Sequence, residues 1–185
     1  MKALFNPFRY IAGAKALTMG LLFIVASALM LYSGNLIQDS YIHIAMAKAS
    51  FWEVLGAQTI WWIIPTALLY LCGLLLSKSK IRIIDILGTT AFAQIILLLM
   101  IAPMLLPAVS QCSAEVMAFV QSGADASSLS MLPLVVYSFW SMICLVLFFI
   151  WNYNAFAVSC NVSGKWAILT FIAVQVVVTL AGALC

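Results

Sequence analysis

The sequence alternates long apolar stretches with short polar connections. An α-helix needs about 20 residues to cross a bilayer, and five stretches of this kind carry almost no charge: residues 16–38, 56–76, 83–105, 132–152 and 166–184. We therefore predict an all-α integral membrane protein, with five transmembrane helices in a single membrane domain over residues 1–185. The first stretch follows basic residues and contains Ala26-Ser27-Ala28, so a cleaved signal peptide is the alternative there. Its apolar run continues to Ile37, which favours an uncleaved span.

The residues before the first span have a helix-start signal. Asn6 is a good N-cap residue, and Pro7 suits the first helical position. A helix from Pro7 towards Lys15 places basic side chains near lipid headgroups. We predict a short N-terminal interfacial helix here, with a frayed terminus as the alternative.

Two of the connections are longer than the others. Residues 39–53 carry charges of both signs, and their aromatic residues Tyr41, Phe51 and Trp52 are expected to anchor this connection at the membrane interface. Residues 110–130 contain Glu115 and Asp125 but no Lys or Arg. Their serines and glycine predict an irregular polar loop.

The loop between the second and third spans orients the whole chain. It contains Lys78, Lys80 and Arg82, and Asp85 follows in the first turn of the third span. Lys or Arg at mid-bilayer costs roughly 2.5–3.5 kcal/mol each on insertion scales, and short basic loops remain cytoplasmic. Five spans with a cytoplasmic N-terminus leave only Lys48 outside and put the other seven cations inside: Lys2, Arg9, Lys15, Lys78, Lys80, Arg82 and Lys165. We therefore predict that the N-terminus is cytoplasmic and the C-terminus is outside.

Composition supports the membrane class. The 185 residues are 66% hydrophobic and 7% charged, with a mean hydropathy of +1.20, whereas soluble domains carry about 25% charged residues. Almost the whole length is used by spans and connections, so no soluble catalytic domain fits. The cations are scattered among the spans, which excludes a nucleic-acid-binding face. The lipid bilayer is the partner that this composition implies.

Signatures of catalysis are absent from the sequence. It contains neither the Gly-x-Ser-Gly of intramembrane serine proteases nor the His-Glu-x-x-His of zinc proteases. His43 is the single histidine, and the five cysteines form no Cys-x-x-Cys pair. We predict a protein without enzymatic activity, metal or cofactor.

The ionisable and polar residues near the spans have two interpretations. Asp85 forms an interfacial ion pair with Arg82, Lys78 or Lys80, or it orients this basic loop for a partner. Gln94 and Gln175 join helices by hydrogen bonds, or they line a substrate pathway.

Two cysteines fall on the predicted outer side. Cys112 lies in the polar loop and Cys185 at the end of the sequence. A disulfide between Cys112 and Cys185 is a further hypothesis.

Three stretches resemble the Yip family, the small five-span membrane proteins associated with Ypt/Rab GTPases, and its compact bacterial branch above all. They are Phe5-Asn6-Pro7-Phe8, the join Gly73–Asp85 leading to Thr89-Thr90-Ala91, and Trp151–Val158 followed by Ser163-Gly164-Lys165-Trp166. The resemblance implies a scaffold or membrane-organising, trafficking-like role, as an oligomer or with other membrane proteins, in the bacterial inner membrane. The alternative is a small transporter or channel subunit.

Overall fold

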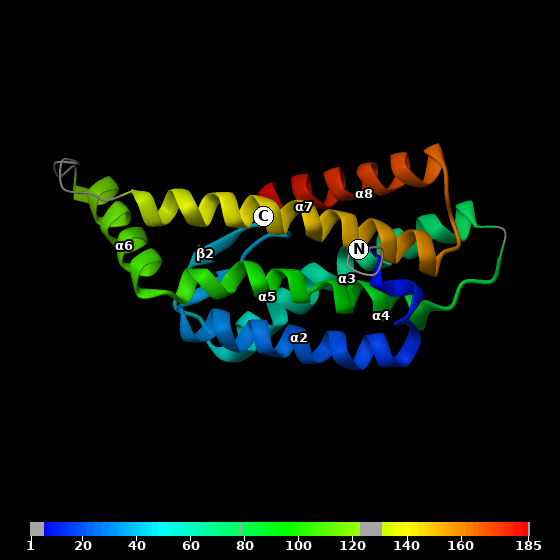
Figure 1. The fold of residues 1–185 in the computed structure, drawn as a ribbon, viewed down its shortest axis with the longest axis horizontal. Helices are drawn as coiled ribbons and strands as arrows, with labels where there is room; N and C mark the ends of the chain where they lie inside the picture. The colour runs from blue at the N-terminus through cyan, green and yellow to red at the C-terminus, as the bar shows by residue number, and fades with distance from the viewer. Residues whose placement is uncertain (1–5, 78, 123–130, 185) are drawn as a thin grey trace.

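The computed structural model describes residues 6–77, 79–122 and 131–184. Within these ranges the chain forms a bundle of long helices with one small hairpin inserted near one end (Figure 1). The elements in chain order are η1 (Pro7–Arg9), α2 (Gly13–Ser33), β1 (Leu36–Gln38), β2 (Ile44–Met46), α3 (Phe51–Leu76), α4 (Ile83–Ala93), α5 (Ile95–Ile101), η2 (Ala102–Leu105), α6 (Pro107–Ser122), α7 (Leu132–Ser159) and α8 (Lys165–Leu184).

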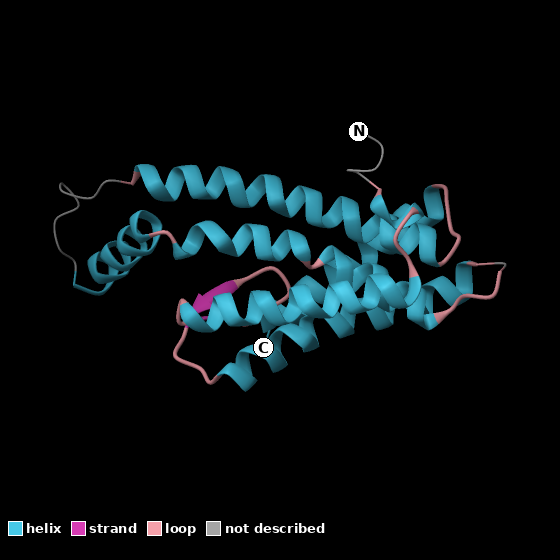
Figure 2. Ribbon diagram, turned by 60° about the horizontal axis from the view of Figure 1, so that its bottom comes forward, coloured by secondary structure: helices cyan, strands magenta, loops and turns pink. Residues whose placement is uncertain are grey.

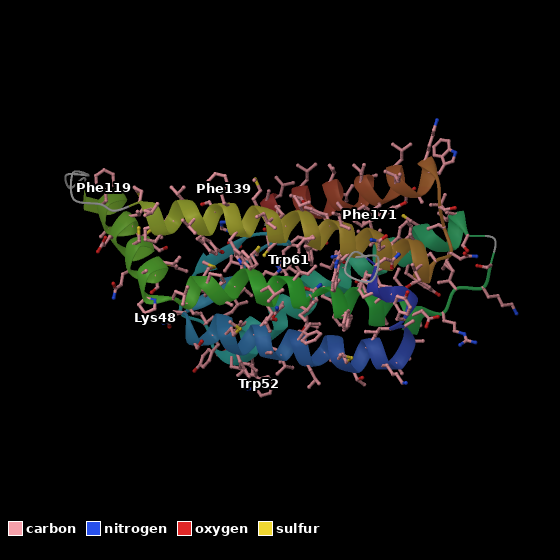
Figure 3. All side chains as sticks on the ribbon, viewed as in Figure 1. Lys48, Trp52, Trp61, Phe119, Phe139 and Phe171 are labelled. Atoms are coloured by element: carbon pink, nitrogen blue, oxygen red, sulfur yellow. The ribbon has the colours of Figure 1, made fainter. Side chains whose placement is uncertain are left out.

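Five helical segments are long and apolar enough to cross a membrane: Gly13–Ser33, Phe51–Leu76, Ile83–Leu105, Leu132–Ser159 and Lys165–Leu184. The prediction of five membrane-crossing helices is confirmed in this sense. Large apolar side chains cover the outside of the bundle, as Trp52 and Phe139 do in Figure 3, whereas Trp61 lies between the helices. A bundle that presents such a surface is suited to hydrocarbon on all sides.

The third span is the centre of the bundle. In its most apolar window 61% of the residues are buried, compared with 11–33% in the other four spans. Figure 1 shows α4 and α5 running between α2 on one side and α7 on the other. The two helices are separated at Gln94, whose N–H donates to the Ala91 carbonyl 3.0 Å away, three residues back. This tighter 3₁₀-type turn divides the span without ending it.

Small residues allow α2 and α4 to touch along their backbones. A Cβ atom placed on Gly20 would lie 2.4 Å from Ala91, and one placed on Gly88 would lie 2.5 Å from the carbonyl oxygen of Gly13. Ala16 is fully buried in the same contact. Close backbone approach at small residues is the usual way to pack helices in lipid, where apolar side chains gain nothing by leaving the hydrocarbon.

The first span ends earlier than the apolar run of the sequence. Helix α2 stops at Ser33, and Asn35 has a φ of 52°, in the left-handed region that ends helices. The apolar residues that follow form strand β1, so the expected span over residues 16–38 was too long at this end. Strand β1 pairs antiparallel with β2, with Leu36 opposite Met46 and Gln38 opposite Ile44.

The hairpin folds back among the helices instead of lying at the interface. Its tip residue Tyr41 is 2% exposed and packs on Phe148, near the middle of α7, with ring centroids 5.8 Å apart. Figure 2 shows the strand alongside the helices and not beyond their ends. The expectation that Tyr41 anchors an interfacial connection was wrong, because its ring packs in a buried apolar cluster that includes Phe148 of α7 and Val174 of α8.

Two further expectations are corrected. The N-terminal helix is only the three-residue turn η1, because the backbone is extended at Ala12 and has a φ of 62° at Gly13, where α2 begins. Residues 107–122 are the helix α6 and not an irregular loop. Proline at its first position and helix-forming residues such as Glu115 and Met117 favour this helix. Residues 123–130 lie outside the described ranges.

Candidate functional site

The spans bury a set of uncharged polar side chains. Eight polar residues of the described spans are at most 6% exposed: Ser27, Gln58, Thr66, Thr89, Thr90, Gln94, Asn152 and Gln175. Buried polar atoms in hydrocarbon cost free energy unless they find hydrogen-bond partners. The partners of these side chains therefore show which helices the buried polar residues join.

The first link joins α2 to α3. The Gln58 side-chain N–H donates to the Ser27 hydroxyl, which in turn donates to the Phe23 carbonyl 2.8 Å away in its own helix. Both residues are almost completely buried, at 1% and 0% exposure. The Gln58 carbonyl oxygen has no hydrogen-bond partner among the described residues. This pair fixes the register of α2 against α3.

The second link joins α3 to α4 around one hydroxyl. The Trp62 indole N–H donates to the Thr90 hydroxyl at 3.1 Å, and the Thr66 hydroxyl lies 3.0 Å from the same atom. Thr90 itself donates to the Ile86 carbonyl at 2.7 Å. Thr90 is thus the point at which two side chains of α3 meet the central helix.

A third link joins α4 to α7. The hydroxyls of Thr89 and Ser159 lie 2.8 Å apart. At the surface of the bundle, the exposed Trp140 donates its indole N–H to the Leu99 carbonyl at 3.0 Å, which joins α7 to α5. The hydrogen bonds of the interior therefore connect α2, α3, the third span and α7 in one series.

The hairpin tip brings a second polar group into the bundle. The Gln38 amide donates to the Tyr41 carbonyl at 3.0 Å, which closes the tip, and His43 lies 2.7 Å from Asp39. Tyr41 reaches Gln175 of α8. Burial raises the pKa of the Tyr41 phenol well above its ordinary value, and the Gln175 amide beside it lowers that pKa in part. The Gln175 amide atoms have no hydrogen-bond partner among the described residues.

The basic loop lies at the opposite end of the molecule from the hairpin strands and α6 (Figure 1). Lys80 and Arg82 are exposed, and Arg82 directly precedes α4; Lys78 lies outside the described residues. Lys15 and Lys165, in the first turns of α2 and α8, are exposed at this same end. The end therefore concentrates positive charge.

Asp85 does not form the expected ion pair with Arg82 or Lys80. Among the described residues the one contact of this kind is between His43 and Asp39, and it is an ion pair only when His43 is protonated. One Asp85 carboxylate oxygen instead lies beside Gly13 at the start of α2, 3.3 Å from where a Cβ atom on this glycine would be. A carboxylate is favoured there because helix N-termini carry partial positive charge.

The two glutamines singled out in the sequence are not brought together by a contact. Gln94 is buried at the junction of α4 and α5, and Gln175 is buried beneath the hairpin on α8. Cys112 is buried on α6, and Cys185 lies outside the described residues, so their pairing stays a prediction.

Sequence reasoning missed Tyr41 and gave Thr90 no special place. The apolar residues Ile42 and Ile44 that flank the hairpin tip are the signal that could have indicated burial of Tyr41. Thr90 and Thr66 are similar in sequence context to other threonines of the spans, so only the three-dimensional structure identifies their contact.

The buried site is built for hydrogen bonding between helices. In residues 6–77, 79–122 and 131–184 no three His, Cys, Asp or Glu side chains gather closely enough to hold a metal ion. The interior polar groups are hydroxyls, amides and indoles, which donate and accept hydrogen bonds without changing charge at neutral pH.

No protein-family model, curated protein or solved structure matches this chain.

Proposed function

We propose that this chain is a non-enzymatic membrane scaffold of the Yip type, which organises a membrane or the proteins within it. The observation that carries the proposal is the series of side-chain hydrogen bonds from α2 to α7. Gln58, Trp62 and Thr89 each bind a residue of another helix. The polar groups of the interior thus hold the helices in fixed positions. This role favours a structural scaffold over a route for a transported substrate.

The orientation that we propose puts the basic end in the cytoplasm. Lys15, Lys80, Arg82 and Lys165 lie at that end, whereas Lys48 lies near α6 at the other (Figure 3). This arrangement supports a cytoplasmic N-terminus and an outer C-terminus, because cations are retained on the cytoplasmic side. The resemblance in sequence favours a bacterial inner membrane.

The partner surface in this proposal is the basic end. Lys80 and Arg82 are exposed and lie in a short connection between two spans. Exposed cations at a membrane surface attract acidic segments of other membrane proteins or of a second copy. The Asp85 carboxylate, in the first turn of α4, lies beside Gly13 at the start of α2.

Cross-linking in native membranes tests the scaffold. The double variant Lys80→Glu and Arg82→Glu should lose most of the cross-linked partner or dimer, and Lys48→Glu, at the opposite end, should keep it. A reversed pattern, or equal cross-linking in both variants, would contradict the assignment of the partner surface.

A second candidate, a small transporter or channel subunit, is favoured by Gln175. The Gln175 amide is buried beside Tyr41, but neither of its polar atoms meets hydrogen-bond geometry with a described residue. A buried amide left unpaired costs about 1–3 kcal/mol, and a bound substrate or ion is one explanation for such a group. Solute flux in liposomes tests this candidate. Flux that is lost in Gln175→Leu or Gln94→Leu would favour transport; a protein that gives no flux but binds its partner supports the scaffold.

A further inference from the structure

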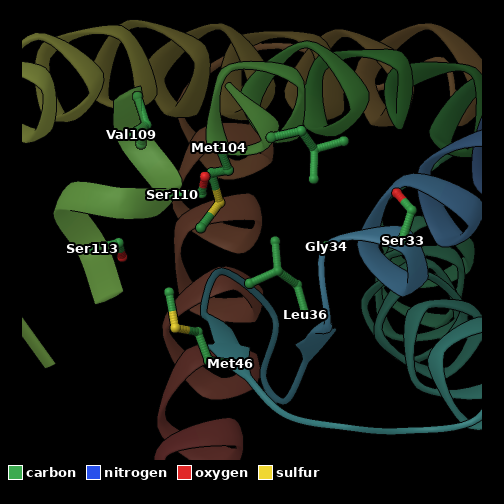
Figure 4. Close-up of a pocket in the computed structure, with 9 residues that line it drawn as sticks. Ser33, Gly34, Leu36, Met46, Met104, Val109, Ser110 and Ser113 are labelled. Atoms are coloured by element: carbon green, nitrogen blue, oxygen red, sulfur yellow. The ribbon is translucent and has the colours of Figure 1, made fainter. Parts of the chain in front are cut away.

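Two cavities lie at the end of the bundle opposite the basic loop, and they share Met104. The first, of about 410 Å³, is partly open and is lined by the end of α2, the hairpin, η2 and α6 (Figure 4). The second, of about 360 Å³, lies between the hairpin, the α5–η2 segment and α7. Each has the size of a small-molecule site, which is typically about 300–1,000 Å³.

The lining of the first cavity is partly polar and carries no charge. Ser33, Ser110 and Ser113 line it, together with apolar residues such as Leu36 and Met46 (Figure 4). The Ser33 hydroxyl donates to the Met30 carbonyl at 2.8 Å, and the Ser110 hydroxyl donates to the Pro107 carbonyl at 3.3 Å. Each of these two hydroxyls already donates its hydrogen to a backbone carbonyl. Its oxygen can therefore only accept a hydrogen bond from a bound molecule.

The second cavity is mainly apolar. Its lining residues are Ile42, Ile44, Met100, Met104, Tyr137, Ser141, Met142 and Leu145. Methionine side chains are flexible and polarizable, and they adapt to chains of varying shape. Met142 is 57% exposed, so the cavity reaches the lipid-facing surface of α7 beside it.

The two cavities lie at different depths. Ser33 ends α2 and Ser110 is in the first turn of α6, so the first cavity is at the level where helices leave the hydrocarbon. Met100 and Leu145 lie within their helices, so the second cavity is inside the apolar layer. The first cavity is therefore the more polar of the two, and Met104 lines both.

We propose that these two cavities form one binding site for a membrane lipid. One acyl chain lies in the second cavity, and a headgroup that bears N–H or O–H donors lies in the first. An acyl chain needs apolar, adaptable walls at membrane depth, and Met100, Met142 and Leu145 supply them. The Ser33 and Ser110 hydroxyls of the first cavity accept hydrogen bonds and carry no charge, so donors on the headgroup decide selectivity.

The walls of this site are held in place. The Trp140 indole binds the Leu99 carbonyl at 3.0 Å, which fixes α7 against α5 directly beside the second cavity. Tyr41 anchors the hairpin on Phe148, which fixes the wall that carries Ile42. A preformed cavity loses less entropy on binding than one that must be ordered by its ligand.

Photolabelling tests the acyl-chain cavity. The protein is reconstituted in nanodiscs that contain a phosphatidylethanolamine with a diazirine on one acyl chain, and labelled residues are located by mass spectrometry after irradiation. We expect labels to concentrate at Met100 and Met142. Leu145→Trp, which fills the cavity, should reduce them about tenfold, a loss of ~1.4 kcal/mol of binding. Ile143→Trp, on the same turn of α7 but outside the lining, should leave them unchanged.

The result that would overturn the chain site is equal labelling of all lipid-facing helices, or an equal reduction in both tryptophan variants. If Leu145→Trp lowers the melting temperature, Met100→Phe fills the same cavity from α5 and gives the same two outcomes.

Headgroup selectivity is tested by competition with unlabelled lipids. Phosphatidylethanolamine, which has N–H donors, should displace the probe several-fold better than phosphatidylcholine, which has none and the same net charge. The double variant Ser33→Ala and Ser110→Ala, which removes both acceptor hydroxyls, should abolish this difference, and a difference that persists would overturn the headgroup site.

Discussion

Replacing Gly20 by alanine tests whether α2 and α4 are joined by direct backbone contact. The new Cβ would lie 2.4 Å from the Ala91 carbonyl carbon and 2.5 Å from the Phe92 nitrogen, whereas non-bonded carbon atoms prefer about 3.5–4.0 Å. The neighbours are backbone atoms that cannot rotate away, so the helices must separate. Thr89 and Thr90, whose hydroxyls bond to α3 and α7, directly precede Ala91 in α4. The separation should therefore also weaken these hydrogen bonds.

The expected cost follows from two opposing terms. Overpacking a well-packed interior costs about 1–3 kcal/mol, and the better helix propensity of alanine returns up to about 1 kcal/mol. We expect a net loss of about 1–2 kcal/mol in the free energy of unfolding. A change of 1 kcal/mol corresponds to about 2–4 °C in the melting temperature of a protein of this size.

The assay is reversible unfolding in mixed detergent micelles, with Gly56→Ala as the matched control. Gly56 is also a helical glycine, but a Cβ placed there meets nothing within 4 Å. Gly56→Ala should therefore be neutral or slightly stabilising. Equal stability of the two variants would refute the reasoning, because a backbone contact at Gly20 must distinguish them.

Three further predictions concern single residues. Thr90→Val removes the acceptor of the Trp62 indole and should cost about 1 kcal/mol in the same unfolding assay, since interhelical bonds in membranes average about 0.6 kcal/mol; Thr59→Val, whose hydroxyl binds only its own helix, should cost almost nothing, and equal losses would contradict the link. Ser50→Ala removes the capping box of α3 and should speed hydrogen exchange in its first turn by the equivalent of about 1 kcal/mol, whereas unchanged exchange would show that the cap is not formed. Burial raises the pKa of the Cys160 thiol to about 12, so maleimide at pH 8 should label Cys160 slowly and an exposed Ser163→Cys variant rapidly; equal rates would contradict this burial.

The five spans could be predicted from sequence because hydrocarbon imposes a strict local rule. About 20 apolar residues without charge have few alternatives to a membrane helix, and this rule located all five segments. The ends were less predictable. Helix α2 stops at Ser33 because of Gly34 and Asn35, although the apolar residues continue into strand β1.

The interior was less predictable because it depends on which helices meet. Gly20 and Gly88 resemble other glycines in sequence, and only the pairing of α2 with α4 gives them their role. The charged residues of the connection 39–53 indicated a position at the membrane interface, but Tyr41 is buried against Phe148. The helix α6 was hidden by its serines, whose low helix propensity is outweighed by the residues around them.

The proposed orientation is tested most directly by reporters fused to the two ends of the chain. A reporter that is active only outside the cytoplasm should be inactive at the N-terminus and active at the C-terminus. This result follows from five crossings with Lys80, Arg82 and Lys165 inside. Activity at both ends, or at neither, would show that the ends share one side and would contradict the account.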